Sequence, residues 1–287
     1  MKILIDAMGG DFAPDATVNG SIEAINAQTG FDVLLVGDSE KIKKILKERN
    51  FDNPRLQIIH TQDVITNEDM PTKAIKRKKD SSMVVGFNML KEKKVDAFIS
   101  AGNSGALLTG ALLILGRLKG VDRPALGAVV PTKKGKCLII DAGLNSSCKP
   151  INYIQFGMFG SYYYKGLFKT ENPRVGLINM GTETQKGSEI LKQAHALLSE
   201  SNLNFVGNVE GKDVPLGNVD IAVCDGYVGN VMLKFLEGTG SFFSSFIKGM
   251  FKRTIFSKLA LLLVAKDLKE FRKMLDKFVL FRLLQVL

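Results

Sequence analysis

The chain begins Met1-Lys2-Ile3-Leu4-Ile5-Asp6-Ala7-Met8-Gly9-Gly10-Asp11, an apolar run that passes into a turn of small and polar residues. A helical pattern follows over Asp15–Ala27. A strand that feeds a helix through such a turn is the βα unit of a parallel sheet. The same order recurs at turns over residues 36–38, 101–105, 141–145, 179–182 and 224–230. The sequence therefore predicts an α/β fold, a mostly parallel sheet with helices on both faces.

The positions of the elements follow from this pattern. We expect strands at residues 2–7, 32–36, 56–60, 95–100, 126–130, 137–141, 174–179, 204–206 and 219–224. Most are continuous apolar runs, which is typical of strands covered on both faces. Helical patterns lie between them, at residues 15–27, 40–49, 82–92, 106–118, 151–168, 188–199 and 228–236. Residues 133–136 (Lys-Lys-Gly-Lys) separate two apolar runs and predict a hairpin, so part of the sheet is expected to be antiparallel.

The composition is that of a soluble enzyme, with 45% hydrophobic and 24% charged residues in a chain of 287. Its cysteines, Cys137, Cys148 and Cys224, are widely spaced and odd in number, which argues for a reducing compartment and matches no zinc pattern. The chain enters a strand at once, which argues against a signal peptide. The uncharged window 97–116 contains a polar turn, so a strand, a turn and a buried helix explain it better than a membrane span.

The net charge of +10 is concentrated at the C-terminal end, because residues 241–287 hold ten Lys/Arg against three Asp/Glu. Apolar residues recur there at helical spacing, and we expect two amphipathic helices over 241–278. Residues 1–240 would then be the α/β catalytic domain and 279–287 an atypical tail. The apolar faces suit a second subunit or an anionic membrane surface, or both. The membrane-facing candidates are Phe246, Phe251, Leu259 and Leu262.

Nucleotide fingerprints are missing from the sequence. No G-x-G-x-x-G follows a strand and no G-x-x-x-x-G-K-[ST] occurs, so we expect neither NAD nor ATP as a cofactor. His60 and His195 have no neighbouring motif, and a structural or surface role is the simpler interpretation than a catalytic base. Cys224 is interpreted as a small buried hydrophobe. The turns suit an anion, and phosphate is the simplest candidate.

Glycine and polar residues of these turns could be plain turn formers, but together they predict one crevice at the carboxyl ends of the strands. Lys186 follows the turn at Gly181 and could hold phosphate as a point charge, or could be a solvated lysine. The basic run at Arg77, Lys78 and Lys79 could be a solvated face, dock an acidic partner or reach an anionic ligand. No aromatic platform accompanies the run, so it does not indicate nucleic acid.

These segments resemble the phosphate acyltransferase family of bacterial phospholipid synthesis. The matching stretches, in the order of the family, are residues 6–11 with Pro14, then 77–83, 100–106, 172–177, 186–187, 204–211 and 224–230. The resemblance implies transfer of a fatty acyl group from acyl-acyl carrier protein to inorganic phosphate, on a fold akin to phosphotransacetylases and isopropylmalate-type dehydrogenases. It also implies a cytoplasmic homodimer without metal or cofactor, peripherally associated with the inner face of the cell membrane. Residues 279–287 resemble nothing in the family, whose members continue with a further strand and helix.

The chemistry that the resemblance implies needs positioning more than a strong base, because a thioester is already activated. Holding two reactants together supplies on the order of 7–11 kcal/mol, and each oxyanion donor about 3–4 kcal/mol. The expected catalytic residues are Lys186, Asn103, Ser104, Asp225 and Asn230. The expected phosphate-binding residues are Asp6, Gly9, Gly10, Asp11, Gly102, Gly105 and Asn145. Carrier proteins are acidic, so Arg77, Lys78 and Lys79 are docking candidates. A coenzyme A-dependent phosphate acyltransferase and a non-catalytic membrane-surface scaffold remain as alternatives.

Overall fold

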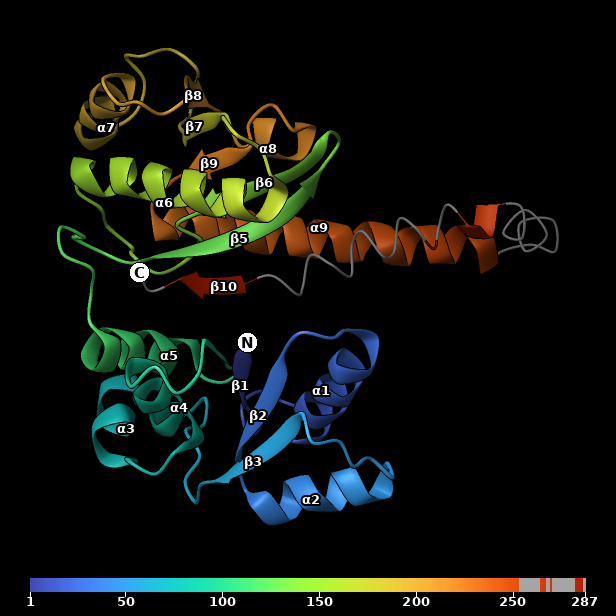
Figure 1. The fold of residues 1–287 in the computed structure, drawn as a ribbon. Coiled ribbons are helices and arrows are strands. Elements are labelled where there is room, and N and C mark those ends of the chain that lie inside the picture. The colour runs from blue at the N-terminus through green and yellow to red at the C-terminus, as the bar shows by residue number, and fades with distance from the viewer. Residues whose placement is uncertain (253–263, 267–268, 270–281, 286–287) are drawn as a thin grey trace. The chain divides into compact units, whose positions relative to one another are not determined.

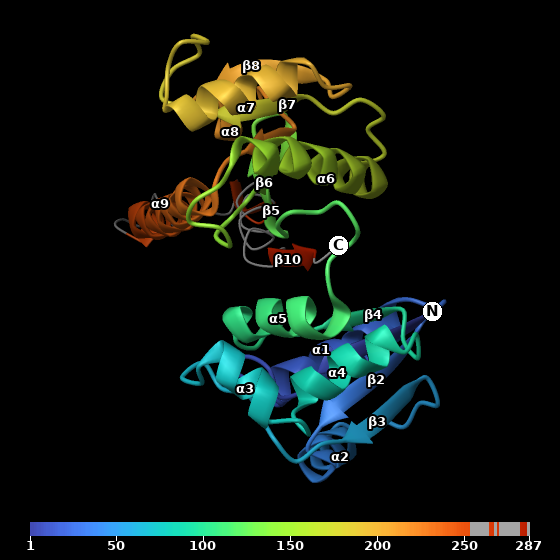
Figure 2. The same cartoon turned by 90° about the vertical axis from the view of Figure 1, so that its left-hand side faces the viewer.

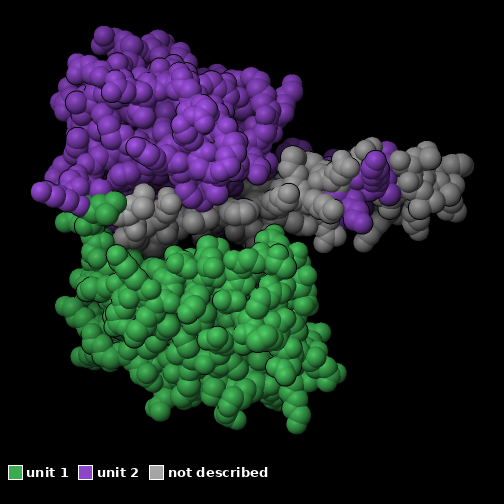
Figure 3. All heavy atoms as spheres, viewed as in Figure 1, with its two compact units in different colours: residues 1–118, 286 green, residues 119–285, 287 purple. Residues whose placement is uncertain are grey.

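The computed structural model describes residues 1–252, 264–266, 269 and 282–285. The chain divides into two compact units, residues 1–118 and residues 119–285, which Figure 3 colours separately. Each unit has its own sheet with helices on its faces (Figure 1). The α/β fold class is therefore confirmed, but the strands form two sheets where the sequence pattern indicated one.

Unit 1 is built on a parallel sheet. Its strands are β1 (Lys2–Asp6), β2 (Asp32–Gly37), β3 (Leu56–His60) and β4 (Ala97–Ile99), in the order β3-β2-β1-β4. Successive side chains of β2 point to opposite faces, as they must in a strand. Leu35 packs with α1 (Asp15–Ala27) and α2 (Ser39–Glu48), whereas Leu34 and Val36 pack with α4 (Ser82–Lys91). A further cluster joins α4 to α3 (Pro71–Arg77), α5 (Ser104–Gly110) and a π-helical turn, η1 (Ala111–Leu115).

Unit 2 has a mixed sheet. Its strands are β5 (Ala125–Thr132), β6 (Gly135–Ile140), β7 (Val175–Ile178), β8 (Phe205–Val209), β9 (Ile221–Val223) and β10 (Arg282–Gln285), in the order β10-β5-β6-β9-β7-β8. The pairs β6–β9, β9–β7 and β7–β8 are parallel. Strand β5 is antiparallel to both β6 and β10. The hairpin predicted at residues 133–136 is confirmed, because that turn joins β5 to β6.

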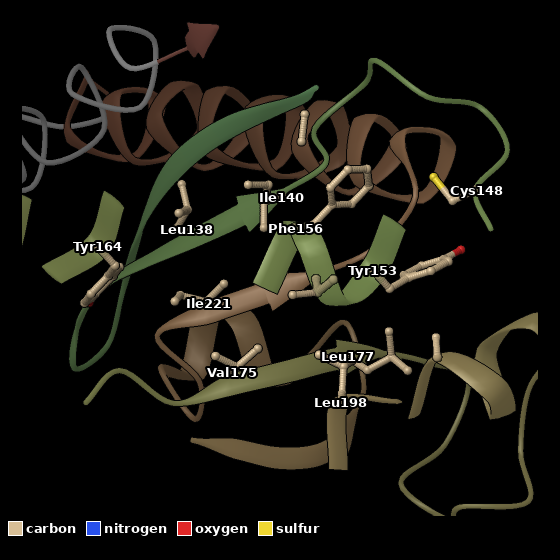
Figure 4. Packing of buried hydrophobic residues seen from close by; sticks show 13 residues of the cluster. Leu138, Ile140, Cys148, Tyr153, Phe156, Tyr164, Val175, Leu177, Leu198 and Ile221 are labelled. Atoms are coloured by element: carbon tan, nitrogen blue, oxygen red, sulfur yellow. The ribbon is translucent and has the colours of Figure 1, made fainter. Parts of the chain in front are cut away.

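Two helical layers enclose the sheet of unit 2. Helices α6 (Pro150–Phe168) and α7 (Glu189–Ser199) cover one face, and α8 (Asp213–Leu216) and α9 (Gly226–Lys252) cover the other (Figures 1 and 2). On the α6 face, the fully buried Phe156 packs in one cluster with Ile140 and Ile221, as Figure 4 shows. On the α9 face, the buried Leu233 packs with residues of β6 and β9. Both faces are thus dry, which explains the continuous apolar runs of the parallel strands.

The expected elements are present, and their ends agree with the expected ones to within three residues, except that the helix expected at 228–236 is α9, which extends to Lys252, and the one expected at 106–118 is α5 followed by η1. Elements without a pattern in the sequence are the short α3 and α8 and the strand β10. Helix α9 continues through position 240. Glycine often ends a helix by adopting a positive φ, but neither Gly238 nor Gly240 does so. The domain boundary at 240 and the helix pair over 241–278 stay predictions, since most of 253–281 lies outside the described residues. Within the described residues, no helix has both the length and the apolar character that crossing a bilayer requires.

Candidate functional site

The predicted polar turns divide between the two units. Unit 1 holds the turns at 6–11, 36–38 and 101–105, which follow the parallel neighbours β1, β2 and β4. Unit 2 holds those at 141–145, 179–182 and 224–230, which follow the parallel neighbours β6, β7 and β9. The carboxyl ends of parallel strands meet at the same edge of a sheet. Each unit therefore gathers three of the turns along one edge of its own sheet.

In unit 1, Asp6 joins two turns together. Its carboxylate is buried and accepts hydrogen bonds from Ser100 Oγ at 2.7 Å and from the Met8 N–H at 3.1 Å. Ser100 Oγ in turn accepts from the Gly102 N–H at 3.1 Å. A Cβ on Gly9 would lie 2.8 Å from both Gly102 N and Asp6 Oδ2, so only glycine fits there. Asp6 is thus an organiser of the edge, and Ser100, which sequence analysis did not select, is its partner.

Asn103 and Ser104 differ in what they can offer a ligand. The buried Asn103 accepts from the Ala106 N–H at 3.0 Å, which caps α5, and its amide group donates to the carbonyl oxygens of Thr66 and Asp69 at 3.0 and 3.3 Å. Its hydrogen-bonding capacity is therefore used by the fold. Ser104 is exposed, and its hydroxyl makes no hydrogen bond within the part of the chain that the structure describes.

The remaining turn residues of unit 1 shape the same edge. Gly10 adopts a φ of +107°, which favours glycine. A Cβ on Gly105 would lie 2.8 Å from Cγ of Pro71, so the α5 turn packs closely on α3. The carboxylate of Asp11 is exposed. The close approach of backbone at these glycines thus adds to the side-chain hydrogen bonds of Asp6, Ser100 and Asn103 in shaping the turns.

The basic run of unit 1 separates into two kinds of residue. Arg77 and Lys79 are exposed. The Lys78 ammonium instead lies 2.6 Å from Asp69 Oδ2 and donates to the Val64 carbonyl at 2.8 Å. The hydrogen bond from Lys78, together with the backbone N–H of Thr66, holds the pKa of Asp69 below its ordinary value. Lys78 therefore fixes a loop, and only its two neighbours are available to a partner.

In unit 2, the buried Asp141 organises the turn after β6. Its Oδ1 accepts from the N–H groups of Leu126, Gly143 and Leu144 at 3.0 to 3.1 Å. Its Oδ2 accepts from the backbone N–H and the side-chain amide of Asn145 at 2.7 and 2.8 Å. The same Asn145 amide donates to the Pro124 carbonyl at 2.8 Å. Both side-chain amide hydrogens of Asn145 are therefore bonded within the protein, which leaves the side-chain oxygen Oδ1 for a ligand.

The turns after β6 and β9 interlock through glycines. The Gly226 N–H donates to the Asn145 carbonyl at 2.8 Å, and a Cβ on Gly226 would lie 2.7 Å from the Leu144 and Asn145 nitrogens. A Cβ on Gly229 would lie 1.9 Å from the Asp141 carbonyl oxygen. Both positions require glycine because the backbones of the two turns lie too close together for a Cβ. The glycines are therefore needed for packing and not only to form a turn.

Asp225 and Asn230 flank this interlocked pair. Asp225 Oδ1 accepts from the Val228 N–H at 2.8 Å and caps α9, while Oδ2 accepts from the Tyr153 hydroxyl at 3.4 Å. Burial, and then the charge of Asp225, raise the pKa of Tyr153, so this hydroxyl stays protonated. Asn230 is exposed, beside Gly143, and its amide makes no hydrogen bond among the described residues. Tyr153 was missed by sequence analysis, since it belongs to the apolar pattern of α6.

Lys186 lies in the loop between β7 and α7, and its side chain is exposed. Its ammonium has no hydrogen-bond or ion-pair partner within the described residues, whereas its backbone is held by hydrogen bonds on both sides. Three of the expected catalytic residues thus have an exposed polar group that a ligand can reach: Lys186, Ser104 and Asn230. The side-chain polar groups of Asn103 and Asp225 are instead hydrogen-bonded within the protein.

The cysteines are buried, whereas the C-terminal helix α9 exposes part of its apolar face. All three cysteines are buried, as expected for Cys224, and burial raises the pKa of Cys148 to about 12. Along α9, Phe246 is exposed and Phe251 is half-buried. Leu259 and Leu262 lie outside the described residues. Among the residues that are described, no group of three or more His, Cys, Asp or Glu could hold a metal ion.

Comparisons of the sequence with known proteins give matches along nearly the whole chain. The family described as fatty acid synthesis protein matches residues 1–278. The chain is 62% identical over 276 residues to the phosphate acyltransferase of Acetivibrio thermocellus, covering 96% of this chain and 81% of that protein. It is 49% identical to that of Alkaliphilus oremlandii, covering 96% and 82%.

Two solved structures resemble this one in fold. They are the EutD phosphotransacetylase from Staphylococcus aureus, with a TM-score of 0.61 at 15% identity, and a phosphotransacetylase from Streptococcus pyogenes, with a TM-score of 0.61 at 14% identity. Each likeness covers 84% of this chain and 82% of the other. The fold expected from the sequence, akin to phosphotransacetylases, is confirmed.

Proposed function

Since the chain belongs to the fatty acid synthesis family and is an acyltransferase that transfers acyl groups to phosphate, we propose that its donor is acyl-acyl carrier protein. The acyl phosphate formed would serve phospholipid synthesis. The observation that carries this proposal is the close similarity to phosphate acyltransferases along nearly the whole chain. Exposed Arg77 and Lys79 support it, because an acidic carrier protein would meet two free cations there.

The reaction proceeds without a covalent enzyme intermediate in this proposal. A phosphate oxygen attacks the thioester carbonyl carbon, the resulting tetrahedral oxyanion collapses, and the carbon–sulfur bond breaks. The proton carried by hydrogen phosphate goes to the departing thiolate, so atoms and charge balance. The cysteines of the chain suit this scheme, since each is buried and its pKa is raised, which makes none of them a ready nucleophile.

The edge of unit 2 is assigned to phosphate. Lys186 supplies an exposed positive charge, and Asn230 supplies an amide that can donate to a phosphate or thioester oxygen. Asp225 and Asn145 act here by fixing the turns from which Asn230 projects, rather than by touching phosphate. A carboxylate such as Asp225 would repel a dianion at close range, and its oxygens are already bonded.

We assign to the edge of unit 1 the binding of an anion through backbone N–H groups of its turns. Gly9, Gly10, Gly102 and Gly105 allow that backbone to approach an anion closely, and the Ser104 hydroxyl adds a donor. Asp6 and Asn103 hold these turns in place, as their hydrogen bonds indicate. Asp11 is exposed beside them, and its carboxylate would repel an anion, so it is not assigned to phosphate here.

We further propose a cytoplasmic homodimer that docks on an anionic membrane surface. Exposed phenylalanines of α9, including Phe242 and Phe246, support an apolar contact, and the basic residues of 241–266 support attraction to anionic lipid. Binding to vesicles with and without phosphatidylglycerol tests the membrane part. Sedimentation equilibrium of the full chain tests the dimer.

The donor is tested by trapping the product with hydroxylamine. The full chain is mixed with phosphate and either acyl-acyl carrier protein or acyl-coenzyme A, and acyl hydroxamate is measured. The proposal predicts phosphate-dependent hydroxamate with the carrier-protein thioester and a much smaller signal with coenzyme A. A preference for coenzyme A would favour the phosphotransacetylase-like alternative. Vesicle binding without any phosphate-dependent thiol release would favour the scaffold.

A further inference from the structure

The loop that carries Lys186 rests on two buried asparagines. It connects β7 to α7, and the Lys186 side chain is exposed. Asn179 follows directly after β7 and is 8% exposed, and Asn208 lies in the neighbouring strand β8 and is 5% exposed. Asn208 pairs with Leu177 of β7, and the Asn179 N–H extends the pairing by donating to the Val209 carbonyl at 2.8 Å, so the backbones of both asparagines are held by the sheet.

Each asparagine donates a side-chain hydrogen bond to a carbonyl oxygen of the loop. Asn179 Nδ2 donates to the carbonyl of Lys186 itself at 3.0 Å, and Asn208 Nδ2 donates to the carbonyl of Glu183 at 2.9 Å. A backbone hydrogen bond of 3.1 Å from the Lys186 N–H to the Glu183 carbonyl links the two anchored residues. The backbone of Lys186 is therefore fixed at its nitrogen and at its oxygen.

Two glycines allow the loop to lie this close. Gly187 has a φ of +90°, and a Cβ there would lie 2.6 Å from Asn179 Oδ1. A Cβ on Gly181 would lie 2.6 Å from Glu183 Oε2 and 3.3 Å from Cγ of Lys186. The first glycine thus permits the contact with Asn179, and the second receives the base of the lysine side chain.

Asn208 is also a polar group that stability alone does not explain. Its Oδ1 is buried without a hydrogen-bond partner among the described residues. Burying an unsatisfied polar atom costs free energy, which an apolar side chain at this position would avoid. The compensating interaction of this side chain is the hydrogen bond from its Nδ2 to the Glu183 carbonyl of the loop.

We propose that Asn179 and Asn208 are positioning residues for phosphate binding, which act by holding the backbone of Lys186. This inference rests on the proposed function of Lys186. A lysine on an unanchored loop would lose conformational freedom each time phosphate binds, and anchoring the backbone beforehand reduces that loss. It also keeps the ammonium within the narrow range of positions that efficient transfer requires.

The test is a double-mutant cycle between Asn208 and Lys186, read as initial rates against phosphate concentration. Asn208→Asp keeps the size of the side chain, and its ionised carboxylate has no donor for the Glu183 carbonyl. We expect it to lower kcat/KM for phosphate by on the order of tenfold to a hundredfold, with KM for the acyl donor nearly unchanged. In the Lys186→Ala background the same substitution should change the rate by less than about twofold, since it acts through the missing lysine.

Asn204→Asp is the matched control. Asn204 precedes β8, and its Nδ2 donates to the Asn172 carbonyl at 3.0 Å, so this variant also removes an asparagine-to-carbonyl bond but touches another loop. It should leave kcat/KM for phosphate unchanged. Thermal unfolding of each variant shows whether it folds, and if Asn208→Asp does not, the same cycle is run with Asn179→Asp.

The outcomes distinguish this inference from the function on which it rests. An equal loss from Asn208→Asp with and without Lys186 would mean a structural role only and would overturn the positioning role. The positioning role would also be overturned if Asn208→Asp kept full activity while Lys186→Ala was impaired. Full activity of Lys186→Ala itself would instead overturn the assignment of phosphate to that lysine.

Discussion

Gly229→Ala is expected to destabilise unit 2, because the added methyl group would meet backbone. The new Cβ would lie 1.9 Å from the Asp141 carbonyl oxygen, about 1.5 Å closer than the 3.4 Å at which ordinary contact begins. Overpacking of this kind costs about 1–3 kcal/mol, and a backbone obstacle places it near the upper value. Alanine returns about 1 kcal/mol of helix propensity within α9. The net loss is then about 2 kcal/mol, or about 4–8 °C in Tm.

Gly238→Ala provides the matched control, because Gly238 lies in the same helix and a Cβ there meets nothing within 4 Å. That variant should gain about 0.5–1 kcal/mol from helix propensity alone. Both are measured by urea and thermal unfolding of the full chain, followed by circular dichroism. If Gly229→Ala melted at or above the wild-type temperature, the close packing of the β6 and β9 turns would be wrong.

Three further predictions concern unit 2. Asp141→Asn should lower the free energy of unfolding by about 2–4 kcal/mol, because the neutral amide cannot accept from every turn N–H that now bonds the carboxylate; urea unfolding measures this, and a loss under about 0.5 kcal/mol would contradict it. Burial acts to raise the pKa of Asp220, but hydrogen bonds from Arg174 outweigh it and hold that pKa below its usual range. Asp220 therefore contributes stability that is present near neutral pH and lost as the pH falls through the lowered pKa. Asp220→Asn should be less stable than the wild type at about pH 7, and its free energy of unfolding should fall less than that of the wild type between about pH 7 and about pH 3. Urea unfolding of both proteins at the two pH values measures this, and the same difference in free energy of unfolding at both pH values would refute it. The buried thiols of Cys137, Cys148 and Cys224 should react with an aromatic disulfide reagent far more slowly in the native protein than in urea; stoichiometric reaction of the native protein within minutes would show that they are accessible.

The sequence predicted the elements of this fold well for a physical reason. Buried parallel strands are continuous apolar runs, and the turns after them are marked by small and polar residues. Strand pairing is not local, so the pattern could not tell that β1 to β4 and β5 to β10 belong to separate sheets. It also could not reveal α8, which spans only Asp213–Leu216 and carries no periodicity.

The candidate site was predictable by position but not by role. Asn103 and Asn230 are both asparagines beside turn glycines, yet the first has its amide bonded by the fold and the second has it exposed. Lys78 and Lys79 are adjacent lysines, and only Lys78 is held by Asp69. Such differences depend on which backbone groups come near in space. Asp141 could have been selected from the sequence, because a carboxylate that ends a buried strand must find several donors.

The role of Lys186 in phosphate binding is tested most directly by the phosphate dependence of acyl phosphate formation in Lys186→Ala. Lys133→Ala is its control, because Lys133 is an exposed lysine of the β5–β6 turn, at the opposite end of the same sheet. If Lys186 binds phosphate, kcat/KM for phosphate should fall on the order of a hundredfold or more in Lys186→Ala and stay at the wild-type value in Lys133→Ala. Wild-type phosphate dependence in Lys186→Ala would contradict the assignment of phosphate to the edge of unit 2.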